Sequence, residues 1–151
     1  MNDVKYAGFW IRTGAALIDS LLVAMVLAPV LSLIYGRDYW HRTAGLSGSW
    51  DFFFNYILPA VAVIAFWVWK SATPGKMILK LRIVDAQTGG KPSTGQFIGR
   101  YLGYYVSILP LMLGIIWVGL DKRKQGWHDK LAGTVVIRDA GTDPVRFEAP
   151  E

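Results

Sequence analysis

The chain has 151 residues, of which 53% are hydrophobic and 14% aromatic, and its formal net charge is +5. The hydrophobic residues form long blocks, which indicates a polytopic membrane protein with a single domain. The basic residues flank these blocks, a pattern typical of a membrane boundary and not of a protein that binds nucleic acid. The chain has no cysteine, which excludes disulfides and cysteine-based metal sites.

The first hydrophobic segment, Ala7 to Tyr35, is long enough for a membrane-spanning helix, since about 20 apolar residues cross the hydrocarbon core. It carries Arg12 and Asp19, and an ionised side chain inside the bilayer needs a partner, water or an ion. Their spacing puts both on one face of the helix but about 10 Å apart along its axis, so they cannot pair directly. Lys5 and Arg12 favour a cytoplasmic N-terminus.

A loop over residues 36–51 separates this segment from a second one, Phe52 to Trp69. The acidic and basic residues of the loop balance, which indicates the non-cytoplasmic side of the membrane. Asp51 is expected to cap the second helix at its beginning.

The stretch 70–96 is the most basic part of the chain. Residues 73–76 are expected to form a tight turn after the second helix. The alternation of apolar and basic residues over 79–84 predicts a β-strand. The basic residues that we expect to contact anionic lipid or a partner protein are Lys76, Lys80 and Arg82.

The third hydrophobic segment covers residues 97–120 and contains Pro110. A second predicted strand, Thr134 to Arg138, would pair with the first only if both lie on one side of the membrane. We therefore favour a re-entrant or short helical hairpin broken at Pro110. The alternative is a plain third crossing, with the tail outside.

Two local patterns mark the beginning of the third segment. Ser93 and Gln96 have the spacing of a capping box. Gly99 and Gly103 form a GxxxG pattern, which lets two helices approach closely.

The predicted fold class is an all-α membrane protein with about three hydrophobic helical segments and a small cytoplasmic two-stranded β-element. We expect one transmembrane domain over residues 1–139 and a flexible polar tail over 140–151.

Several ionisable residues lie in, beside or just after the hydrophobic segments, namely Arg12, Asp19, Arg100, Asp121 and Asp129. A carboxylate in a membrane can exchange a proton for a hard cation such as Na⁺, because both compete for the same oxygens. The structural alternative is that Asp19 pairs permanently with an arginine such as Arg100 and sets the helix register. The sequence has no pattern of an enzyme, a metal site or a cofactor site.

Four parts of the sequence together resemble the RDD family of small bacterial membrane proteins, named for one arginine and two aspartates. They are FWIRTGAALIDSLLV, ATPGKMILKLRIVD, Arg100, and DKRKQGWHDKLAGTVVIRD. The resemblance covers about residues 8–139. It implies a multi-pass protein of the bacterial inner membrane, and some members are similar to proteins proposed as Na⁺/H⁺ antiporters or other transport components.

The resemblance places the family arginine at Arg12, the first aspartate at Asp19 and the second at Asp129, with Asp121 as the alternative. Our leading hypothesis is monovalent-cation/proton exchange (Na⁺, Li⁺ or K⁺), with Asp19 as the exchanging carboxylate and Asp129 closing the cytoplasmic side. Arg12 or Arg100 would be the electrostatic partner of Asp19.

About three hydrophobic segments can hardly enclose a transport path within one chain, so transport implies a homo-oligomer or a partner. The alternative function is a non-transporting membrane adaptor that binds anionic lipid or a protein partner through its basic stretch. In that case Arg12 and Asp19 would be purely structural.

Overall fold

The structure is a computed structural model that describes residues 4–41, 49–139, 141 and 143–147. Parts of the predicted loop 36–51 and of the predicted tail 140–151 therefore lie outside the described residues. The elements in chain order are α1 (Phe9–Tyr35), η1 (Arg37–His41), α2 (Ser49–Phe52), the π-helical η2 (Phe53–Ile57), α3 (Leu58–Lys70), α4 (Pro74–Ile78), β1 (Leu81–Asp85), α5 (Thr94–Ile108), α6 (Leu113–Leu120), α7 (Trp127–Ala132) and β2 (Thr134–Arg138).

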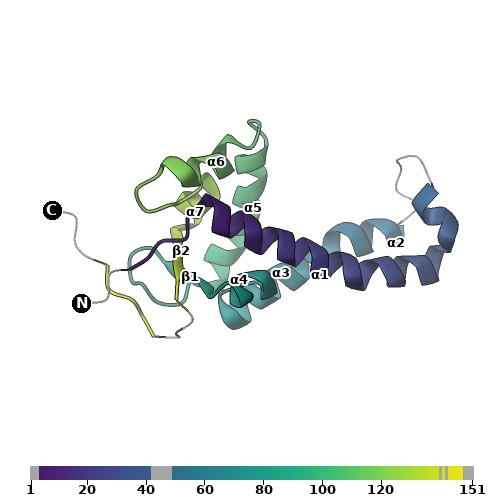
Figure 1. Cartoon of the computed structure of the whole chain (residues 1–151), viewed down its shortest axis with the longest axis horizontal. Helices are drawn as coiled ribbons and strands as arrows, with labels where there is room; N and C mark the ends of the chain where they lie inside the picture. Colours follow the sequence, from purple (N-terminus) through teal and green to yellow (C-terminus); the bar gives the residue numbers. More distant parts are fainter. Residues whose placement is uncertain (1–3, 42–48, 140, 142, 148–151) are drawn as a thin grey trace.

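Two helical stretches, Phe9–Tyr35 and Ser49–Ile78, are long and apolar enough to cross a membrane, as predicted. They extend from the end of the molecule that holds the sheet and α7, and they meet again near α2 (Figure 1). At the α2 end, the Tyr39 hydroxyl and the Asn55 amide both donate to a carboxylate oxygen of Asp51, at 2.7 Å each. Asp51 thus lies inside α2 and joins the hairpin, so the prediction that it caps the helix is wrong.

The third apolar segment is broken, as the favoured hairpin requires. Helices α5 and α6 are bent by 101° at the break between them. Leu111 and Met112, directly after Pro110, have φ angles of 53° and 61°, a left-handed backbone that ends the helix and turns the chain back. The strand before this segment pairs with the strand after it, so the chain returns to the end where it started, and a plain third crossing does not describe the fold.

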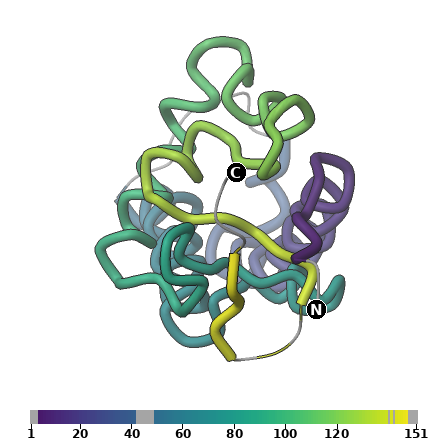
Figure 2. Tube along the Cα trace, turned by 90° about the vertical axis from the view of Figure 1, so that its left-hand side faces the viewer, coloured from purple at the N-terminus to yellow at the C-terminus, as the bar shows by residue number. Residues whose placement is uncertain are grey.

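The predicted strand pair is confirmed, with β1 antiparallel to β2 and Ile83 opposite Val136. Figure 2 views this end of the molecule and shows β2 passing beside the start of the chain, where the Ala7 amide donates to the Val136 carbonyl. Strand β1 begins at Leu81, later than predicted, because the preceding residues form α4 in place of a tight turn. Thr73 before Pro74 is a common way to begin a helix, since proline suits the first helical position.

The described residues after β2 contact the sheet end of the molecule. The Val145 amide donates to the Gly89 carbonyl at 3.0 Å. The ring of Phe147 stacks on Tyr6, and both pack against the buried strand residues. Val145 and Phe147 therefore pack against the sheet.

Helix α5 packs closely against α7, and Gly103 is the point of nearest approach. A methyl group added at Gly103 would lie 2.9 Å from the His128 Cα, whereas one added at Gly99 would meet nothing within 4 Å. Only one glycine of the GxxxG pattern therefore serves close packing. The capping box of Ser93 and Gln96 at the beginning of α5 is present as predicted.

We predict that Gly103→Ala lowers the stability of the protein by about 1–3 kcal/mol, because the methyl group overpacks the contact with α7. Gly99→Ala is the matched control, and it should leave the stability unchanged or raise it, because alanine favours a helix. The measurement is thermal unfolding in detergent. Equal melting temperatures for the two variants would contradict this account of the α5–α7 contact.

Candidate functional site

The carboxylate of Asp129, at the beginning of α7, is fully buried and lies between two arginines. Arg12 donates from Nη1 to Asp129 Oδ2 at 2.5 Å, and Arg100 Nη1 pairs with Asp129 Oδ1. The Gly126 amide donates to the same Oδ2 at 3.0 Å. One carboxylate thus joins α1, α5 and α7, and we call Arg12, Arg100 and Asp129 the arginine–aspartate cluster.

Arg12 uses donors on all three guanidinium nitrogens. Besides Asp129, it donates from Nε to the Ala7 carbonyl at 2.8 Å and from Nη2 to the Lys124 carbonyl at 2.6 Å. These bonds attach the beginning of α1 to Ala7, just before it, and to the loop before α7. A planar group with fixed donors suits this role, which the single ammonium of a lysine could not fill.

Arg100 is fully buried and donates from Nη1 to the Thr134 hydroxyl at 2.9 Å. Its Nε and Nη2 have no hydrogen-bond partner among the residues that the structure describes. The guanidinium lies 5.4 Å from the ring centre of Trp67 and 5.8 Å from that of Tyr104. These ring faces stabilise the excess positive charge of the cluster, since two arginines share one carboxylate.

The structure therefore corrects the predicted partner of Asp19. Both Arg12 and Arg100 pair with Asp129, because α7 folds back against the beginning of α1 and places this carboxylate beside the two arginines. Asp121, the alternative second aspartate, lies outside the cluster and pairs with Lys130 at 2.5 Å.

Asp19 binds the beginning of α4 instead of an arginine. Its Oδ1 accepts from the Gly75 amide at 2.7 Å, and its Oδ2 accepts from the Thr73 hydroxyl at 2.5 Å. Glycine is required at this contact, because a methyl group at Gly75 would lie 2.2 Å from the Ala15 carbonyl oxygen. Nothing in the sequence marks a backbone amide as the partner of Asp19.

Lys76 is only 7% exposed, so the prediction that it contacts a lipid surface is wrong. Its ammonium donates to the Thr73 hydroxyl at 3.4 Å and has no carboxylate within 4 Å among the described residues. The Thr73 hydroxyl therefore connects the ammonium of Lys76 to the carboxylate of Asp19. Of the other two predicted contact residues, Lys80 is exposed and Arg82 is 8% exposed and paired with Asp139 at 2.6 Å.

Asp19 and Lys76 line a cleft of about 700 Å³ between α1, α3, α4 and α5. Apolar side chains make most of its walls, and Tyr104, Tyr105 and Thr73 add hydroxyl groups. Asp129 does not line this cleft. The cleft is large enough for a hydrated ion or a small molecule. Its charged side chains, Asp19 and Lys76, lie where α4 forms its wall.

His128 lies between the cluster and α5. Its ring stacks on Tyr104 with 4.1 Å between ring centres, and its backbone amide donates to the Ser107 hydroxyl at 3.0 Å. Burial, followed by the charges of Arg100, Arg12 and Lys76, lowers the pKa of His128 to about 2. Asp129 lies 3.6 Å from the ring but is already neutralised by its two arginines. His128 is thus a neutral packing residue.

The cleft brings one carboxylate, Asp19, and one ammonium, Lys76, to a common space. Among the described residues, no group of three or more histidines, aspartates or glutamates could hold a metal ion. Sequence reasoning missed Thr73 and Tyr104, and it named Lys76 as a contact for lipid or a partner and not as a residue beside Asp19. The Thr73-Pro74 pair does signal a helix beginning, which would have placed Lys76 on a helix face.

We predict that Asp129→Asn destabilises the protein by about 3–5 kcal/mol, because two buried arginines lose their counter-charge. Asp121→Asn is the control, since its partner Lys130 is partly exposed and such a pair contributes about 1 kcal/mol or less. Thermal unfolding in detergent measures both. A smaller loss for Asp129→Asn than for Asp121→Asn would show that the cluster does not hold the fold.

We also predict that the protein loses stability as the pH falls below about 6.5, the ordinary pKa of histidine. Folded His128 stays neutral while the unfolded chain takes up a proton, so stability is full above this pH and declines below it by up to about 1.4 kcal/mol per pH unit. His128→Gln should remove this part of the slope in melting temperatures measured from pH 7.5 to 4.5. Parallel pH profiles of the two proteins would contradict it.

Comparison with known proteins gives relatives that are named as uncharacterized proteins. RP437 of Rickettsia prowazekii is 38% identical over 84 residues, which make up 56% of this chain but only 46% of that protein. YxaI of Bacillus subtilis is 30% identical over 88% of this chain and 97% of its own length. YteJ of the same organism, named as a membrane protein, is 25% identical over 91% of both chains. No solved structure matches the chain. The model of the RDD family matches residues 6–133, so the protein belongs to the RDD family.

Proposed function

We propose that this membrane protein is a transporter that exchanges a monovalent cation (Na⁺, Li⁺ or K⁺) for a proton, with Asp19 as the carboxylate that binds the cation. The observation that carries the proposal is the difference between the two aspartates. Asp129 lies buried between two arginines, whereas Asp19 lines the cleft and, among the described residues, accepts hydrogen bonds from one amide and one hydroxyl.

The depth of Asp19 along α1 supports this role. Trp10 is 81% exposed near the beginning of α1, and exposed tryptophans suit the membrane–water interface. Asp19 lies about 14 Å further along the helix, at 1.5 Å per residue. A carboxylate at that depth is costly unless it faces a partner, water or an ion, and such residues often mark an ion or proton pathway. The cleft gives Asp19 a path to exchange ligands.

Lys76 supplies the proton in this proposal. With Lys76 protonated and Asp19 ionised, the pair is neutral. A cation that binds Asp19 repels the neighbouring ammonium, and release of one proton from Lys76 restores neutrality. The Thr73 hydroxyl lies between the two groups, so cation and proton are coupled one for one without a net change of charge in the membrane.

The transport path is completed by further copies of the chain. Only 6% of the most apolar window is buried in each of the two candidate spans. Large apolar side chains such as Leu17, Leu21 and Val61 are more than half exposed. A homo-oligomer would cover part of this surface and enclose the cleft, which one chain leaves accessible.

A second candidate, the non-transporting adaptor, is favoured by the exposed basic residues at the sheet end, such as Lys70, Lys80 and Lys91. In that case Asp19 holds α4 against α1 permanently. The two candidates differ in whether the purified protein moves ions.

We predict a cation-dependent pH change in proteoliposomes that contain the protein and a pH-sensitive dye, when Na⁺, K⁺ and Li⁺ are added in turn. Asp19→Asn should reduce this flux at least about tenfold while the protein remains folded, because the amide cannot neutralise a bound cation. Asp121→Asn is the control that should keep the flux.

Flux that survives Asp19→Asn would refute the assignment of the carboxylate. If well-folded wild-type protein shows no flux with any of the three cations, the transport proposal is refuted and the adaptor remains. Lys76→Met should abolish the coupled pH change, since it removes the group that releases the proton.

A further inference from the structure

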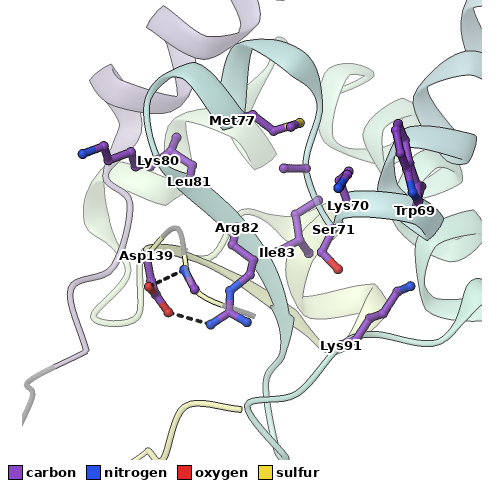
Figure 3. A pocket seen from close by; sticks show the side chains of 12 residues that line it. Trp69, Lys70, Ser71, Met77, Lys80, Leu81, Arg82, Ile83, Lys91 and Asp139 are labelled. Atoms are coloured by element: carbon purple, nitrogen blue, oxygen red, sulfur yellow. Dashed lines mark hydrogen bonds and ion pairs between the residues drawn. The ribbon is translucent and has the colours of Figure 1, made fainter. Parts of the chain in front are cut away.

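A second pocket, separate from the cleft, lies beside β1 at the end of the second apolar stretch. It has a volume of about 400 Å³ and is formed by the end of α3, by α4, by β1 and by residues after β2. Its polar and charged lining residues, which define the basic pocket, are Lys70, Ser71, Lys80, Arg82, Lys91 and Asp139. Figure 3 shows the guanidinium of Arg82 beside Asp139, Ser71 and Lys91 on the other side of Arg82, Lys70 above Ser71, and Lys80 further away with its amine pointing outward.

The basic pocket has more positive than negative charge. Its one carboxylate, Asp139, pairs with Arg82 Nη2 at 2.6 Å, and its other oxygen accepts from the Gly141 amide at 2.8 Å. Lys70, Lys80 and Lys91 form no ion pair with the described residues. Three positive charges therefore remain without a counter-charge around one pocket.

Hydrogen-bond donors in the basic pocket also remain unused. Arg82 is 8% exposed, and both of its hydrogen bonds come from Nη2, to Asp139 and to the Asp143 carbonyl. Its Nε is buried without a partner among the described residues. The hydroxyl of Ser71 forms no hydrogen bond with them either. A buried guanidinium with spare donors is a common way to bind a phosphate group.

The surroundings of the basic pocket point to a lipid as the source of this phosphate. Trp69, at the end of the apolar stretch, is 68% exposed, and Met77 and Ile78 on α4 are 45% and 61% exposed. This apolar rim adjoins the basic lining, so a ligand with a charged head and alkyl chains meets both. A soluble phosphate compound would leave the rim in water.

We propose that the basic pocket binds the head group of an anionic phospholipid, with the phosphate at Arg82, Ser71 and Lys91 and the acyl chains along Trp69 and Met77. Lys70 and Lys80 strengthen the attraction from the rim. This site does not depend on the proposed exchange at Asp19, and it serves equally in a transporter or an adaptor.

The test uses the full chain purified in a mild detergent and titrated with short-chain phosphatidylglycerol, with the shift in melting temperature and native mass spectrometry as readouts. The double variant Lys70→Gln/Lys91→Gln should bind this lipid about tenfold more weakly, since two charges at a membrane surface are lost. Lys122→Gln is the control, because Lys122 is exposed and does not line the pocket. It should bind like the wild type.

Three further ligands identify what is recognised. Short-chain phosphatidylcholine should bind more weakly than phosphatidylglycerol, because its head group has no net charge. Glycerol 3-phosphate and inorganic phosphate should also bind more weakly, because they have no chains for the apolar rim. Equal binding of either lipid, equal binding by the double variant, or tighter binding of a chain-free phosphate would each overturn the proposal.

Discussion

The buried contact of Asp129 with Arg12 and Arg100 is the interaction on which the rest of the structure depends. Two guanidinium groups in the interior are tolerable only while a carboxylate lies between them, because an unpaired buried charge costs several kcal/mol. The carboxylate comes from α7, so α7 must fold back beneath α1 and α5. This return also places β2 beside β1 and turns the third apolar segment back to the sheet end.

Asp19 and Asp129 thus have different physical surroundings. The charge of Asp129 is balanced by two arginines. If Asp129 bound another partner instead, both buried arginines would lose their counter-charge. Asp19 is held by dipoles, an amide and a hydroxyl, whose loss costs much less than the loss of a buried ion pair. The carboxylate of Asp129 therefore holds the fold, whereas that of Asp19 is available to a ligand.

Much of the fold, but little of the site, could be predicted from the sequence. Hydropathy identifies the two long spans, and Pro110 together with the strand pairing identifies the break in the third. Helical periodicity places Arg12 and Asp19 on one face, yet it cannot tell which element covers each of them. The partner of Arg12 lies 117 residues away, and that of Asp19 is partly a backbone amide, which no residue type marks. Lys76 counts as one more basic residue of a basic stretch until α4 turns it inward.

Helix α4 connects the cleft with the basic pocket. Lys76 lines the cleft, and its neighbour Met77 lines the basic pocket, so adjacent residues of one short helix serve both. Gly75 leaves no space between α4 and α1, and Asp19 holds the same residue by its amide. The helix therefore cannot shift toward a bound head group without changing the hydrogen bonds of Asp19. Asp19 and Thr73, whose hydrogen bonds hold α4 against α1, also line the cleft, so any movement of α4 at the basic pocket would change the surroundings of Asp19.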